Sequence, residues 1–134
     1  MEGNSTNKDG FSVVKRAKSF THAWRGIGIF IKTTHNTWIH LAILALTVAA
    51  GVYFKITSTD WLFIILASGF VLVSEAFNTA IEIDIDLTSP EYHPFARDTK
   101  DVAAAAVLLA SITAALIGLF MFTPYLLGLM HVWK

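Results

Sequence analysis

The sequence predicts an all-α membrane protein with one helix on the membrane surface and three transmembrane helices. Three long apolar runs, residues 38–54, 61–81 and 102–122, are each long enough to cross a hydrocarbon core of about 30 Å as a helix. A soluble helical bundle is the alternative. It is disfavoured because 54% of the 134 residues are hydrophobic, which leaves too few polar residues to cover a globule. The absence of cysteine excludes disulfides and thiolate chemistry.

The N-terminal part is expected to contain a disordered polar tail, residues 1–10, followed by an amphipathic surface helix, residues 11–32. Apolar residues such as Phe20 and Trp24 recur at helical spacing between basic residues such as Lys18. A helix of this kind lies in the interface, with its apolar side among acyl chains and its lysines near anionic headgroups. No nucleic-acid partner is expected, because binding one would need basic residues on a water-facing domain and the sequence predicts no such domain.

The surface helix and the three spans are expected to form a single membrane-embedded domain, residues 11–134. The spans are predicted at about these residues: 36–54, 61–86 and 98–122. Pro94 is expected to interrupt regular structure before the third span. Trp38, Trp61 and Tyr125 lie near the predicted ends of the spans, where amphipathic rings prefer the headgroup layer.

Basic residues are distributed unevenly between the two sides of the membrane. Eight of the ten lysines and arginines precede the first span or lie between the second and third spans. By the positive-inside rule, the N-terminus and the loop after the second span are therefore expected in the cytoplasm, and the C-terminus outside.

Carboxylates at the end of the second apolar run mark the expected working site, because charge at membrane depth is costly and is usually functional. On a helix that turns about 100° per residue, Glu75, Glu82 and Asp86 fall within roughly 40° of one another. Asn78 lies about 60° to one side of this stripe, and Asp84 points to the opposite face. The stripe is therefore expected to act as one unit.

An acidic stripe near a lysine at the cytoplasmic surface suggests a magnesium and phosphate site. Mg²⁺ prefers oxygen ligands, commonly one or two carboxylates with water and phosphate oxygens completing its octahedron. Lys100 and Asp101 open the third helix close to the stripe, although Lys100 alone is equally well explained as a helix-end lysine that reaches the interface. Phosphoryl transfer needs little more than positioning, charge neutralisation and a base. The sequence contains no Gly-rich phosphate loop that would indicate a different nucleotide-binding fold.

Three motifs resemble the prokaryotic diacylglycerol kinase and undecaprenol kinase family. They are Glu75-x-x-Asn78-Thr79-Ala80-Ile81-Glu82-x-x-x-Asp86, Pro90-Glu91-Tyr92-His93-Pro94 and Lys100-Asp101-x-Ala103-Ala104-x-Ala106-Val107. The similarity extends over about residues 11–122 and includes Ile39-His40-Leu41 in the first half.

The resemblance implies a small homotrimeric kinase of the bacterial cytoplasmic membrane that transfers the γ-phosphate of ATP to a lipid alcohol with Mg²⁺. It implies that Glu75 is the general base, that Glu82 and Asn78 hold the metal-bound nucleotide, and that Lys100 and Asp101 contact the nucleotide. The supporting residues implied for the same site are Asp86, Lys18 and His93. A homotrimer is also expected because buried carboxylates in an isolated chain would face lipid on at least one side.

One position departs from the family pattern. The family usually carries a metal-binding glutamate at the end of the surface helix, where this chain has Thr33 and Thr34, and Thr34 is the expected equivalent. A neutral hydroxyl is a weaker metal ligand than a carboxylate. His35 is an alternative metal ligand, although a lone histidine at a membrane interface is more often a hydrogen-bonding surface residue.

Two other functions remain open at this point: a lipid-phosphate phosphatase that uses the same metal site, and a catalytically impaired homologue. The acceptor is either undecaprenol or diacylglycerol. The motifs around His40 and His93 favour the undecaprenol branch.

Overall fold

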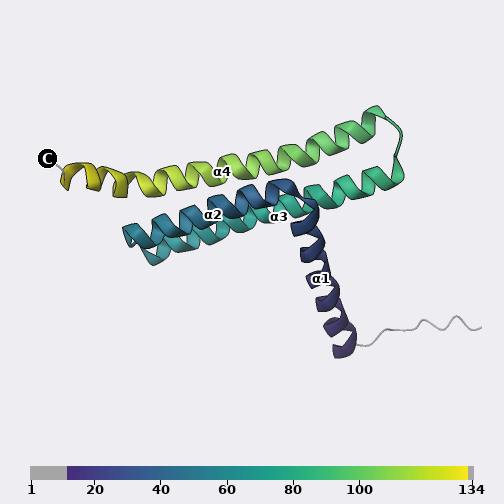
Figure 1. Ribbon diagram of the computed structural model, residues 1–134, viewed down its shortest axis with the longest axis horizontal. Coiled ribbons are helices and arrows are strands. Elements are labelled where there is room, and N and C mark those ends of the chain that lie inside the picture. The colour runs from purple at the N-terminus through teal and green to yellow at the C-terminus, as the bar shows by residue number, and fades with distance from the viewer. Residues whose placement is uncertain (1–11, 133–134) are drawn as a thin grey trace, which may run out of the picture.

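The computed structural model describes residues 12–132, except for the side chains of Val14, His35 and residues 130–132. The described residues fold into four helices, which are α1 (Val13–Thr33), α2 (His35–Phe54), α3 (Ser58–Thr88) and α4 (Pro94–Val132). Figure 1 shows α3 and α4 running side by side as a long hairpin, with α2 along the first half of α3 and α1 projecting steeply away from the other three. The predicted tail, residues 1–10, lies outside the described residues.

Helix α1 begins at Ser12, whose hydroxyl accepts a hydrogen bond from the backbone N–H of Lys15 at 3.4 Å, the usual geometry of an N-cap. It ends at Thr34, which has an extended backbone and also caps the start of α2. A single residue therefore turns the chain from α1 into the bundle. Phe20 and Trp24 are 70% and 71% exposed, as expected for a helix whose apolar side lies among acyl chains.

The turn between α2 and α3 is tightly packed. Lys55 adopts a left-handed conformation with φ 51°, which ends α2, and Thr57 and Asp60 form a capping box at the start of α3. Tyr125 of α4 donates a hydrogen bond to Asp60 Oδ2 at 2.7 Å. A β-carbon at Gly51 would lie 2.9 Å from side-chain atoms of both Ile56 and Trp61, so this glycine permits the close approach of the turn to α2.

Helix α4 is longer than the third predicted span at both ends. Pro94 begins the helix instead of interrupting it, because a proline in the first turn loses no backbone hydrogen bond. At the other end α4 continues through Pro124 to Val132. In an apolar environment no water replaces lost backbone hydrogen bonds, so a helix persists past a proline more readily than it does in water.

Three of the helices are long and apolar enough to cross a membrane: Asn36–Phe54, Ser58–Thr88 and Pro94–Leu129. The small buried core of Ile56, Ile64 and Met121 lies near the turn between α2 and α3. Most large apolar side chains on these helices are exposed within the single chain, which suits surfaces that face lipid or other subunits. The chain is a multi-pass membrane protein.

Candidate active site

Glu75 is the most deeply buried ionisable residue among those described. It lies on α3 with 1% of its surface exposed, and its Oε1 atom is 3.0 Å from Nε2 of His40 on α2. The sequence identified Glu75 as a carboxylate within an apolar run but did not identify its partner. The same argument would have found it, because His40 is also an ionisable residue inside an apolar run.

Asn78 and Glu82 form a second contact one turn further along α3. Asn78 Nδ2 donates a hydrogen bond to Glu82 Oε1 at 3.0 Å, a pairing that i,i+4 spacing on a helix allows. Asn78 is 8% exposed, and its Oδ1 atom is buried without a hydrogen-bond partner among the described residues. A buried acceptor of this kind normally has a hydrogen-bond partner. The Oδ1 atom of Asn78 is therefore available to a cation or to a hydrogen-bond donor.

These residues line a polar cavity of about 290 Å³. Glu75, Asn78 and Glu82 all contribute to its wall from α3, as their helical spacing predicts. The other walls come from the first turns of α2 and from the α4 segment that begins within its alanine run: Asn36, His40, Ala104, Val107, Leu108 and Ser111.

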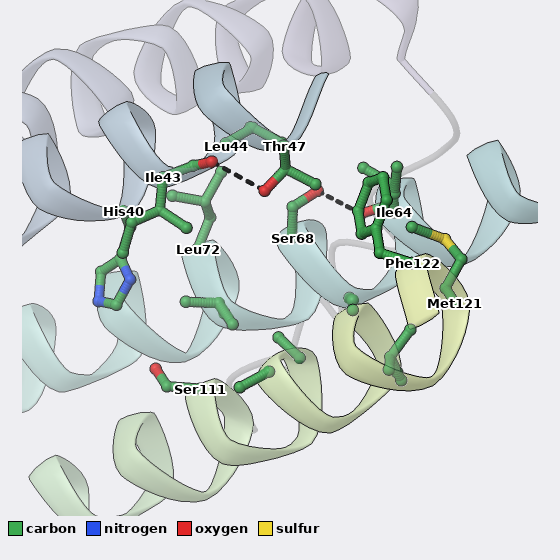
Figure 2. A pocket seen from close by; sticks show the side chains of 16 residues that line it. His40, Ile43, Leu44, Thr47, Ile64, Ser68, Leu72, Ser111, Met121 and Phe122 are labelled. Carbon is green, nitrogen blue, oxygen red and sulfur yellow. Dashed lines mark hydrogen bonds between the residues drawn. The ribbon is translucent and has the colours of Figure 1, made fainter. Parts of the chain in front are cut away.

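An apolar cavity of about 300 Å³ adjoins the polar one. His40 and Ser111 line both cavities, so the two meet next to Glu75. In Figure 2 His40 lies at one end of the apolar cavity and Met121 and Phe122 lie at the other. Glu75 lines only the polar cavity, and its partner His40 lines both.

Lys100 and Asp86 bring the start of α4 to the end of α3. Lys100 Nζ lies 2.9 Å from Asp86 Oδ1, and both side chains are partly or largely exposed. Asp86 follows Glu82 by one helical turn, so the ammonium group lies near the C-terminal end of the acidic stripe. Asp101 instead forms an i,i+4 pair with Arg97 on α4, at 3.4 Å, and does not contact the stripe.

Of the other predicted site residues, Thr34 lies beside α3, whereas Lys18 and His93 lie away from the acidic stripe. Thr34 Oγ1 is 2.6 Å from Thr79 Oγ1, one turn from Glu75. Lys18 is exposed on α1, and the structure shows no contact between it and the acidic stripe. His93 precedes α4, where its Nδ1 accepts a hydrogen bond from the backbone N–H of Phe95 at 3.3 Å. The side chain of His35 lies outside the described part of the structure.

The donor set can be tested for its fit to a magnesium ion. Among the side chains that the structure describes, no three histidine, aspartate or glutamate residues converge as a metal-binding group. Glu82 and the unpaired Oδ1 of Asn78 nevertheless offer two neighbouring oxygen ligands that line one cavity. That set suits Mg²⁺, because this ion usually takes one or two protein ligands and completes its shell with water and phosphate oxygens.

Comparison with known proteins gives the family. The sequence model of the family described as prokaryotic diacylglycerol kinase matches residues 21–122. The chain is 37% identical to the undecaprenol kinase of Bacillus subtilis, over 81% of this chain and 89% of that protein. It is 36% identical to a diacylglycerol kinase of Synechocystis, over 84% of this chain and 65% of that protein. It is 27% identical to the diacylglycerol kinase of Escherichia coli, over 84% of this chain and 90% of that protein. The chain therefore belongs to the prokaryotic diacylglycerol kinase family, a family of lipid kinases.

Proposed function

We propose that this protein transfers the γ-phosphoryl group of ATP to the hydroxyl group of undecaprenol at the cytoplasmic surface of the bacterial membrane. The observation that carries the proposal is the position of Glu75, which is buried in the wall of the polar cavity and contacts His40, a residue that lines both cavities. A phosphate donor requires a polar chamber and a lipid alcohol requires an apolar one, and both substrates must meet at the base. The proposal agrees with membership of a lipid kinase family.

Glu75 acts as the general base in the proposed reaction. The oxygen of the lipid hydroxyl attacks the γ-phosphorus of ATP while its proton passes to the Glu75 carboxylate. A new bond forms between the lipid oxygen and phosphorus, and the bond between phosphorus and the β,γ-bridging oxygen breaks. The products are the lipid phosphate and ADP, and Glu75 later returns its proton to water.

The nucleotide is assigned to the polar cavity and its cytoplasmic end. Glu82 and Asn78 would hold Mg²⁺, which would neutralise phosphate charge and orient the triphosphate. Lys100 supplies a cation for the phosphates, and Asp86 keeps its ammonium group at the end of α3 through their contact of 2.9 Å. Asp101 is proposed to contact the nucleotide from the same turn of α4. Lys18 and His93, which do not line the cavity, are proposed to have supporting roles.

Thr34 occupies the position at which the family pattern has a metal-binding glutamate. Its hydroxyl lies next to Thr79, which is on the same stretch of α3 as Glu75 and Glu82. Asn36, two residues further along the chain, lines the polar cavity, and we propose that a carboxylate at position 34 would reach it. We propose that the protein works without this ligand and has a correspondingly weaker affinity for Mg²⁺.

Undecaprenol is preferred to diacylglycerol as the acceptor on the basis of similarity. The relative named undecaprenol kinase matches at 37% identity over 89% of its own length. The diacylglycerol kinase of Synechocystis matches at 36% identity over 65% of its length, and that of Escherichia coli matches at 27%. Both lipids present a hydroxyl at the interface with apolar chains below it, and the apolar cavity accepts either on chemical grounds.

The N-terminus and the site are assigned to the cytoplasm by the excess of basic residues on that side. The active assembly is proposed to be a homotrimer with sites shared between subunits. Support comes from the many apolar side chains left exposed on the single chain and from the cost of leaving carboxylates next to lipid.

The decisive experiment follows labelled phosphate. The purified protein is incubated with γ-labelled ATP, Mg²⁺ and either undecaprenol or diacylglycerol, and the lipids are separated by thin-layer chromatography. Label in undecaprenyl phosphate supports the proposal, and label only in phosphatidic acid would move the acceptor to diacylglycerol. Release of phosphate from a lipid phosphate without ATP consumption would instead identify a phosphatase. Absence of all three activities in folded protein would indicate an impaired homologue.

A further inference from the structure

We propose that His40 is a positioning residue that holds the carboxylate of Glu75 in the orientation needed to accept the proton of the lipid hydroxyl. The inference rests on the proposed role of Glu75 as the base. The imidazole N–H at Nε2 donates to Oε1 and leaves Oε2 for the acceptor.

The contact joins two helices at the point where the two cavities meet. His40 Nε2 of α2 and Glu75 Oε1 of α3 are 3.0 Å apart, and the two side chains are 20% and 2% exposed. Since His40 lines both cavities, the hydroxyl of a lipid lying in the apolar cavity would pass the imidazole on its way to the carboxylate. The histidine is therefore placed both to hold the base and to form part of its entrance.

The neighbouring donors on α3 are committed to other partners. Asn78 donates to Glu82 Oε1 at 3.0 Å, and the Thr79 hydroxyl donates to the backbone carbonyl of Glu75 at 2.9 Å. His40 is the one hydrogen-bond partner of the Glu75 carboxylate among the described residues, and Oε2 has none. A carboxylate taken out of water needs such a donor, and a single directed donor also selects one rotamer.

Orientation of a base affects the rate of proton transfer more than the binding of ATP. A displacement of about 1 Å at a reacting group costs on the order of 10²-fold in rate. Loss of the His40 contact should therefore lower kcat and leave the KM for ATP close to its original value. A side-chain amide donor at the same position should recover part of the lost rate.

The test compares His40→Leu and His40→Gln in the full-length protein, alone and combined with Glu75→Gln. We expect His40→Leu to lower kcat by roughly 10- to 100-fold with less than about a twofold change in the KM for ATP. His40→Gln should retain more activity than His40→Leu. Once Glu75 is glutamine, His40→Leu should cause little further loss, because the two residues act as one unit. His22→Leu, the same substitution at an exposed histidine of α1, is the matched control and should leave kcat unchanged.

A second measurement is independent of activity. The ¹⁵N NMR signals of the His40 ring, assigned by their loss in His40→Gln, should show the Nε2–H tautomer and should shift when Glu75 is replaced by glutamine. The inference is overturned if folded His40→Leu keeps the wild-type kcat or if its loss of activity lies wholly in the KM for ATP. It is also overturned if the chemical shifts of the ring nitrogens do not change when Glu75 is replaced. Failure of the proposed function is a different result: the wild-type protein would then phosphorylate neither lipid while the NMR contact persisted.

Discussion

Thr34 and Thr79 share a hydrogen bond of 2.6 Å that ties the junction of α1 and α2 to the turn of α3 above Glu75. Because the Thr79 hydroxyl donates to the Glu75 carbonyl, the proton between the two threonines comes from Thr34. Thr33 points elsewhere, since its hydroxyl donates to the carbonyl of Ile29 and its side chain is exposed. The two adjacent threonines are thus not equivalent.

The first prediction uses this difference. Thr34→Glu should place a carboxylate next to Thr79, on the stretch of α3 that carries Glu75 and Glu82. It should lower the half-saturating Mg²⁺ concentration or raise kinase turnover, because a charged oxygen binds Mg²⁺ more strongly than a hydroxyl. Titration of activity with Mg²⁺ at fixed ATP measures the effect. Thr33→Glu is the matched control and should change the titration less. If both variants fold and neither alters the Mg²⁺ dependence, Thr34 does not occupy a deficient ligand position.

The second prediction concerns the base. Glu75→Gln should preserve the fold and ATP binding and lower turnover by about 10² to 10⁴, because the amide accepts the His40 hydrogen bond but does not take up a proton. Turnover and ATP affinity are measured on the same preparation. Asp84→Asn alters an exposed carboxylate on the face of α3 opposite the stripe and should leave turnover unchanged. Near-normal turnover in Glu75→Gln would remove Glu75 from this role.

The third prediction concerns Lys100. Lys100→Met should raise the KM for ATP by roughly 10-fold or more, since a cation that contacts phosphate is lost, while thermal stability changes little because the Asp86 pair is exposed. Lys55→Met, on the other side of the membrane, serves as the control for general loss of charge. An unchanged KM for ATP in Lys100→Met would assign Lys100 to the ion pair alone.

The fourth prediction concerns assembly. If the proposed assembly is correct, the active species in detergent should have the mass of a homotrimer, because neighbouring subunits would cover the apolar side chains that a single chain leaves exposed. Light scattering and kinase assay on the same column fractions measure this relationship. A fully active monomeric fraction would contradict shared sites.

The fifth prediction concerns stability. Gly51→Ala should lower the free energy of unfolding by about 1–3 kcal/mol, because the added methyl group meets Ile56 and Trp61 at 2.9 Å. Unfolding in detergent, followed by circular dichroism, gives the difference. Gly69→Ala introduces the same methyl group on α3 where no atom lies within 4 Å, and it should be neutral or slightly stabilising. Equal effects at both glycines would show that helix propensity, not the close approach, determines the outcome.

The local parts of the fold and site were predictable, and the contacts between helices were not. Helical spacing alone placed Glu75, Asn78 and Glu82 on one wall, since their relation depends on a single helix. The pairing of His40 with Glu75 depends on how α2 packs against α3, which no local pattern encodes. The expected contact of Asp101 with the nucleotide stays a prediction, and the structure adds the pair that Asp101 forms with Arg97 on its own helix. Pro94 was misjudged because its effect depends on whether it begins a helix or interrupts one.

The length of α3 links the reaction to the thickness of the bilayer. Its 31 residues extend about 46 Å, whereas the hydrocarbon layer is only about 30 Å thick. Part of the helix therefore extends beyond the hydrocarbon layer. The residues from Trp61 to Ile81 match that depth, and Glu82 follows at the exit. A thicker bilayer would draw Glu82 into hydrocarbon, and a thinner one would bring water closer to Glu75. We therefore expect turnover to peak at one acyl-chain length, which would make the enzyme responsive to the composition of the membrane in which it works.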